Sequence, residues 1–70
     1  MNLNPEKLYH SKWTAVKPQN KEKHFIVTKV LKDDNDRVQD VVLEAVLTKQ
    51  VWQMPWRELK DASVWLAGWQ

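Results

Sequence analysis

The sequence predicts a mainly β domain, a small curled antiparallel sheet that forms an SH3-like partial barrel with a short C-terminal helix. β-branched and aromatic residues are concentrated in runs at 12–17, 23–32 and 37–49, and such residues suit a pleated, half-buried surface. Clusters of Pro, Asn and Asp separate these runs and favour turns. Strands this long in a chain of 70 residues must curl to enclose a core. A flat meander with the helix across one face is the alternative.

The length allows a single domain, residues 1–70, near the lower limit for independent folding. The chain has no cysteine, which excludes disulfides and thiolate metal sites. Four of its five tryptophans fall within residues 51–69, and an enclosed Trp buries on the order of 200 Å². We therefore expect most of the tryptophans to lie in the core. We divide the domain into a lead-in (1–11), the strands (12–54) and a Trp-rich cap (55–69).

The lead-in is expected to be loosely ordered, with one short turn. Asn4 can cap that turn, and Pro5 suits its first helical position. Leu8 and Tyr9 are the bulky apolar groups that follow. We expect the lead-in to dock on the domain through one of them.

Three strands come next. Residues 12–17 form the first, and the segment 18–22 breaks it because Pro cannot donate to a ladder and Asn favours turns. The second strand covers 23–32. The acidic segment 33–36 then reads as a hairpin turn into a long strand over 37–49.

The long strand has two unequal faces. Apolar residues alternate on one of them: Val41, Leu43, Ala45 and Leu47. The other face mixes polar and apolar residues: Asp40, Val42, Glu44 and Val46. This mixture suggests that something partly covers the second face or that the strand bends. After a break at 49–50, a fourth strand is expected over 51–54.

The pattern changes after Pro55. Residues 56–60 read as one helical or 3₁₀ turn. Asp61 is a good N-cap for a helix over 62–67, and Gly68 is the residue expected just beyond its end.

Several short segments, in this order, are similar to a family of small tryptophan-rich bacterial proteins. They are Ser11-Lys12-Trp13-Thr14-Ala15, Lys23-His24-Phe25, Leu43-Glu44-Ala45-Val46-Leu47-Thr48, Trp56-Arg57-Glu58-Leu59 and the run from Trp65 to Gly68-Trp69. The resemblance covers about residues 11–69 and implies a free-standing small protein. It implies no particular activity, so no functional residue is carried over.

Composition limits the function classes. Eleven basic and nine acidic residues give a net charge of +2, which indicates a mixed, soluble surface. No apolar run approaches the roughly 18 residues of a membrane span, and the first residues do not resemble a secretory signal. We expect a cytoplasmic monomer that does not contact a membrane.

The sequence offers no reaction centre. The acidic segment 33–36 lacks the ligand spacing and the glycine of a calcium loop, and no metal or cofactor is expected. His24 has no nucleophile in a recognised setting. Glu44 is best explained by a cross-strand pair with Lys29 or Lys12. We therefore expect no enzyme activity.

A non-catalytic interaction module is the function we expect, with a protein or peptide partner favoured. The candidate binding residues combine cations and rings: Lys12, Trp13, Lys23, His24, Lys29, Trp52 and Arg57. The alternative is weak binding of single-stranded nucleic acid, by phosphate attraction and base stacking. Its support is charge asymmetry: residues 1–32 hold seven lysines and two acidic residues, and residues 33–70 hold four basic and seven acidic ones.

Overall fold

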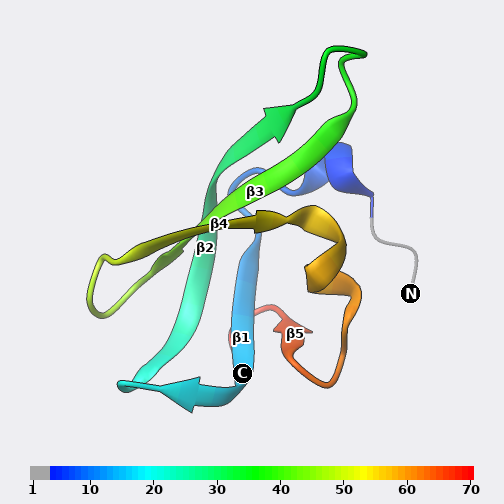
Figure 1. Cartoon of the computed structure of the whole chain (residues 1–70). Coiled ribbons are helices and arrows are strands. Elements are labelled where there is room, and N and C mark those ends of the chain that lie inside the picture. The colour runs from blue at the N-terminus through cyan, green and yellow to red at the C-terminus, as the bar shows by residue number, and fades with distance from the viewer. Residues whose placement is uncertain (1–3) are drawn as a thin grey trace.

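The protein is described here by a computed structural model that places residues 4–70. Its elements in chain order are η1 (Pro5–Lys7), β1 (Lys12–Gln19), β2 (Glu22–Lys32), β3 (Val38–Ala45), β4 (Val51–Pro55), η2 (Trp56–Lys60) and β5 (Trp65–Ala67). The strands form one antiparallel sheet in the order β4-β3-β2-β1-β5 (Figure 1). The mainly β prediction is confirmed. The sheet is not closed, because β4 and β5 are its two edges.

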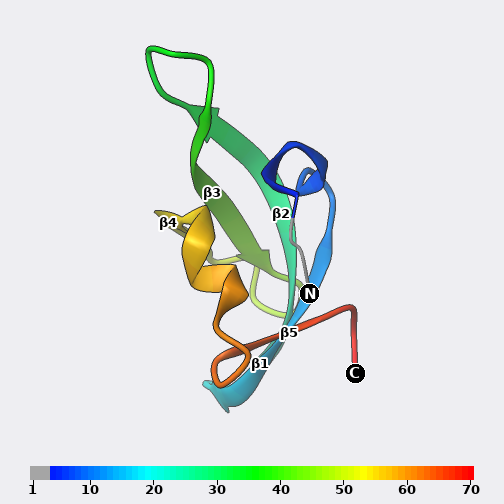
Figure 2. The same cartoon turned by 90° about the vertical axis from the view of Figure 1, so that its right-hand side faces the viewer.

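One face of the sheet carries the core. The strands curve, and η2 lies against that face next to β3 (Figure 2). The buried cluster consists of Leu8, Trp13, Phe25, Val27, Val41, Leu43, Ala45 and Leu59. Leu59 comes from η2, so this short helix closes one end of the core.

β3 confirms the predicted apolar face over most of its length. Val41, Leu43 and Ala45 are fully buried. Leu47 was expected to extend this face but is 67% exposed, because β3 ends at Ala45 and a turn follows. The turn reverses at Lys49, whose φ is +67°, an unusual value for a lysine.

The first hairpin turn is tighter than the break predicted over 18–22. β1 continues through Pro18, and Gln19 faces Glu22 across a two-residue loop. Asn20 and Lys21 have φ values of +54° and +62°, as a type I′ hairpin turn requires. Pro18 is tolerated in the strand because the β1–β2 register is irregular between Thr14 and Gln19, where no regular ladder bond is lost.

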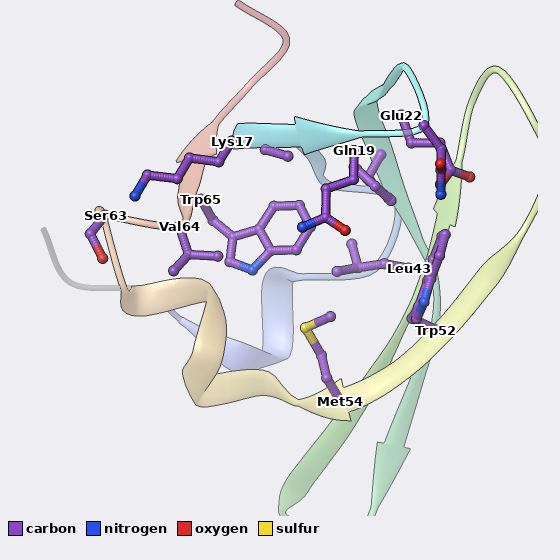
Figure 3. Close-up of a pocket in the computed structure, with 12 residues that line it drawn as sticks. Lys17, Gln19, Glu22, Leu43, Trp52, Met54, Ser63, Val64 and Trp65 are labelled. Carbon is purple, nitrogen blue, oxygen red and sulfur yellow. The ribbon is translucent and has the colours of Figure 1, made fainter.

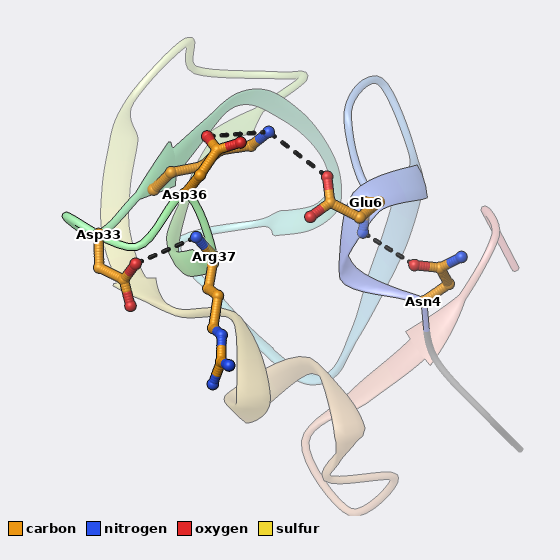
Figure 4. A network of polar contacts seen from close by, with 6 residues as sticks. Asn4, Glu6, Asp33, Asp36 and Arg37 are labelled. Atoms are coloured by element: carbon orange, nitrogen blue, oxygen red, sulfur yellow. Dashed lines mark hydrogen bonds and ion pairs between the residues drawn. The ribbon is translucent and has the colours of Figure 1, made fainter.

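The acidic segment forms the predicted turn between β2 and β3. Asp33 Oδ1 accepts a hydrogen bond from the backbone N–H of Asn35, over 2.8 Å. It accepts a second from the backbone N–H of Arg37, over 3.0 Å (Figure 4). The backbone of Asp33 also donates to the carbonyl of Arg37. Asp side chains favour such turns by bonding their own backbone.

The lead-in docks as expected. The side chain of Asn4 accepts a hydrogen bond from the N–H of Glu6, with Pro5 at the start of η1. Leu8 is the docking residue, since it is buried while Tyr9 is 57% exposed. Lys32 Nζ lies 3.5 Å from Glu6 Oε2 (Figure 4). Residues 1–3 of the expected lead-in lie outside the described residues.

The helix predicted over 62–67 is wrong. Asp61 Oδ1 accepts hydrogen bonds from Ser63, but the chain then turns and β5 begins at Trp65. β5 pairs with the free edge of β1. Six residues are too few for a stable isolated helix, so hydrogen bonding to an open sheet edge prevails over the capping pattern. The 3₁₀ turn expected over 56–60 is confirmed.

The tryptophans are less buried than predicted. Trp13 is 4% exposed and belongs to the core. Trp56 and Trp65 are half-buried and pack against it. Trp52 and Trp69 are 39% and 44% exposed. Of the five tryptophans, Trp13 is therefore the one that is fully buried in the core, although most of them were expected there.

Candidate binding groove

A groove of about 480 Å³ opens on the core-bearing face of the sheet. It lies between β4 and the segment that joins η2 to β5 (Figure 3). Its larger apolar lining residues are Phe25, Leu43, Trp52, Met54, Val64 and Trp65. Polar residues also line it: Lys17, Gln19, Asn20, Glu22 and Ser63. An apolar floor with a few polar groups is typical of ligand pockets, and the volume is within their usual range.

Three aromatic rings are joined in the groove. Phe25 meets Trp65 edge to face, with ring centroids 5.1 Å apart and planes at 88°. Phe25 also contacts Trp52 edge to face, with ring centroids 5.7 Å apart and planes at 66°. Phe25 itself is buried, so it fixes the two indoles that border the opening.

The indole N–H of Trp65 has no acceptor within residues 4–70, unlike that of Trp13, which donates to Ser11 Oγ over 2.8 Å. No buried polar side-chain atom in this described part of the chain lacks a partner, so the N–H of Trp65 is reached by solvent. Trp65 extends into the groove (Figure 3). The groove thus offers a free hydrogen-bond donor beside apolar surface.

Two charged residues line the groove, Lys17 and Glu22. The side chain of Lys17 is exposed to solvent, whereas that of Glu22 is buried. Glu22 is buried and accepts a short hydrogen bond from the hydroxyl of Thr48. Lys17 is exposed and takes part in neither of the two ion pairs found within residues 4–70. The accessible charge at this rim is therefore positive.

Among the residues predicted to bind, Trp52 is the one that lines the groove. Trp13 is buried and does not line this groove, so its role in binding stays a prediction. Lys23 and Lys29 are exposed on β2. Arg57 lies 6.0 Å from the ring of Trp56, outside the groove.

Lys12 and His24 are brought together on the other face of the sheet, around Trp69. Lys12 Nζ lies 4.7 Å from the centre of the Trp69 ring, and His24 lies 5.7 Å from it. The indole N–H of Trp69 donates to the carbonyl of Phe25. The C-terminal residues thus cover part of this face over β1 and β2.

The sequence did not single out Trp65, Met54 or Lys17 as groove residues. Because side chains alternate along a strand, Lys17 lies on the same face of β1 as Trp13. This alternation could have indicated Lys17 as a groove residue. No local pattern predicts that Trp65 faces Met54, because this depends on the pairing of β5 with β1.

Residues 4–70 contain no group of three or more His, Asp or Glu side chains that could hold a metal ion. Glu44 lies opposite Ile26, whereas Lys29 lies opposite Val42, so the expected Glu44–Lys29 pair is not in register.

Asp61 lies in the turn before β5 and has a lowered pKa. A hydrogen bond from the Ser63 hydroxyl, and a second from the Ser63 backbone N–H, lower the pKa of this carboxyl below its ordinary value of 3.8. Asp61 is fully exposed and lies in the turn before β5, so its ionisation concerns that turn.

Comparisons with known proteins give a family but no activity. A family model described as "Tryptophan-rich protein (DUF2389)" matches residues 11–70. No curated protein and no solved structure matches the chain. Within residues 4–70, neither short helix has the length and apolar character needed to cross a membrane.

Proposed function

Because the chain belongs to the tryptophan-rich family matched over residues 11–70, whose description assigns no activity, we propose a function from its surface. The protein is a non-catalytic interaction module that takes up an extended segment of another protein in the aromatic groove. The observation that carries this proposal is the groove itself, where Trp52 and Trp65 border an apolar opening.

Burial energetics support this site. Trp52 is 39% exposed although its ring packs on Phe25, so a partner can still remove much of its surface from water. Exposed apolar area gains about 25 cal/mol per Å² when buried, and tryptophans are enriched among the residues that dominate binding energy.

A peptide segment suits the shape of the opening. The groove lies between strand β4 and the β5 connection and is partly open to solvent, so a peptide segment can reach its apolar lining. The mixture of apolar floor and polar rim gives room for one or two apolar side chains with the backbone at the rim.

Two further properties of the protein, its type of fold and its location as a monomer, are also proposed. We propose that the fold is an SH3-like partial barrel, because both edge strands contribute groove residues, Trp52 from β4 and Trp65 from β5. We also propose a cytoplasmic monomer, on the mixed surface charge and the absence of cysteine.

Selection from a random decapeptide library against the immobilised protein tests the function. Peptides that bind should lose at least tenfold in affinity with Trp52→Ala, since a half-exposed anchor ring is removed. Tyr9→Ala is the matched control: Tyr9 is more exposed than Trp52 and lies outside the groove lining, so this change should leave affinity unchanged.

Two outcomes would overturn the proposal. One is a selection that yields no peptide whose binding depends on Trp52. The other is tight binding of a fluorescent single-stranded oligonucleotide, with log affinity falling against log salt at a slope near −3 for about four neutralised phosphates. That result would establish the nucleic-acid alternative.

A further inference from the structure

We propose that the segment taken up by the groove is proline-containing, binds in the polyproline II conformation and carries an acidic residue. This inference rests on the proposed function and specifies the chemistry of the partner. Three features of the groove support it: the arrangement of its rings, the free indole N–H and the free ammonium at its rim.

The rings provide two flat surfaces held at fixed positions. The centroids of Trp52 and Trp65 lie 5.7 and 5.1 Å from that of Phe25, which sets an upper bound on their separation. A polyproline II helix rises about 3.1 Å per residue, so equivalent residues recur about every 9 Å. This repeat falls within that upper bound, and both rings line the groove, so two turns of one peptide can each meet an indole.

The indole N–H of Trp65 favours a polyproline II backbone. Carbonyl groups in this conformation make no internal hydrogen bonds and stay free to accept, whereas the carbonyls of a helical peptide are already paired. The N–H of Trp65 is accessible and has no acceptor within the described residues. A peptide carbonyl can therefore accept a hydrogen bond from this N–H without displacing any hydrogen bond within the protein.

The charge at the rim selects an acidic neighbour. Lys17 lines the groove and is exposed, while the carboxylate of Glu22 is buried and bonded to Thr48. A negative side chain next to the prolines gains attraction to Lys17. A positive one meets an unpaired ammonium, which disfavours the complex.

Proline also lowers the cost of ordering the peptide. A proline-containing segment already populates the bound conformation, so it loses less conformational entropy than a flexible segment. This matters for a groove of about 480 Å³, which contacts only a few residues and cannot offset a large ordering cost.

The test uses the Trp52-dependent peptides from the random selection, with affinity measured by fluorescence anisotropy. We expect enrichment in prolines at P-x-x-P spacing and in Asp or Glu. Replacing those prolines with Ala should weaken binding at least tenfold, and replacing the acidic residue with Lys should weaken it by about threefold or more. Trp52-dependent peptides that lack proline, or that tolerate its removal, would overturn this inference and leave the proposed function intact.

Two protein variants test the donor and the charge. Trp65→Phe keeps a ring but removes the N–H, and should weaken binding by about threefold to tenfold, the worth of one hydrogen bond. Lys17→Glu should reverse the preference, so that the Lys-substituted peptide binds better than the acidic one. Circular dichroism establishes that each variant is folded. If Trp65→Phe unfolds, the Lys17→Glu reversal decides alone, and an unchanged acidic preference would contradict the proposal.

Discussion

The backbone N–H of Gln70 donates a hydrogen bond to Oγ1 of Thr14, over 2.9 Å. The same hydroxyl donates to the carbonyl of Gly68, over 2.7 Å. Thr14 is buried and both bonds are partly buried, and together they fasten the end of the chain to β1. One side chain in the first strand thus orders the two residues on either side of Trp69.

We predict that Thr14→Val destabilises the protein by about 1–3 kcal/mol. The substitution keeps the branched shape but leaves the partly buried carbonyl of Gly68 and N–H of Gln70 without their partner, which costs about that much. Urea unfolding followed by circular dichroism measures the change. Thr28→Val is the control, because Thr28 Oγ1 reaches the carbonyl of Val42 only at 3.5 Å. Equal losses in the two variants would contradict the role of Thr14.

The tryptophans should differ strongly in their contribution to stability. Trp13→Ala removes a ring that is 4% exposed and should cost about 3–5 kcal/mol. For a small domain this approaches the whole free energy of unfolding, so the variant should be largely unfolded at 37 °C. Trp52→Ala should remain folded. A folded Trp13→Ala protein with an unchanged melting midpoint would show that this ring is not structural.

Lys21→Gly should stabilise the protein by about 1 kcal/mol. Lys21 has a φ of +62°, where a side chain costs roughly 1–2 kcal/mol and glycine costs little. The change also creates an Asn-Gly pair at 20–21, the sequence preferred for a type I′ turn. The melting temperature should therefore rise by about 4–8 °C. Lys29→Gly, within β2, is the control and should destabilise. A lower melting temperature for Lys21→Gly would contradict the turn geometry.

The turn before β5 should weaken in acid. Hydrogen bonds from Ser63 hold the pKa of Asp61 below 3.8, so the folded carboxyl has a lower pKa than the unfolded one. The resulting contribution to stability is present above about pH 4 and is lost as the pH falls through the folded pKa. An NMR titration of the Asp61 side chain checks this, and Ser63→Ala should raise the midpoint. A wild-type midpoint at or above 3.8 would disprove the shift.

Local patterns predicted those elements whose hydrogen bonds are local. The cap at Asn4 and the turn at Asp33 depend on side chains that bond backbone groups only two to four residues away. The buried face of β3 follows from simple alternation. Such features are visible in sequence because their partners are neighbours in the chain.

The features that the sequence did not predict depend on distant partners. Asp61 and Gly68 carry helix signals, yet the strand at 65–67 forms because β1 has a free edge more than fifty residues earlier. The groove also depends on the pairing of β5 with β1, because Trp65 of β5 lines it. The burial of Trp13 is not visible in its local sequence either, because a tryptophan beside lysines has the same sequence pattern whether its ring faces inward or outward.

The pairing of β1 with β5 also implies an order of assembly. Strands β1 to β4 form a meander in which each strand pairs with its neighbour in sequence, so those contacts close short loops. Pairing of Trp13 with Ala67 closes almost the entire chain and carries a larger entropic cost. We expect β5 to dock last during folding and to detach first in partial unfolding. Amide hydrogen exchange should then be faster at Leu66 and Gly68, whose N–H groups point toward β1, than at Val27 and Val41, and equal protection at all four would contradict it.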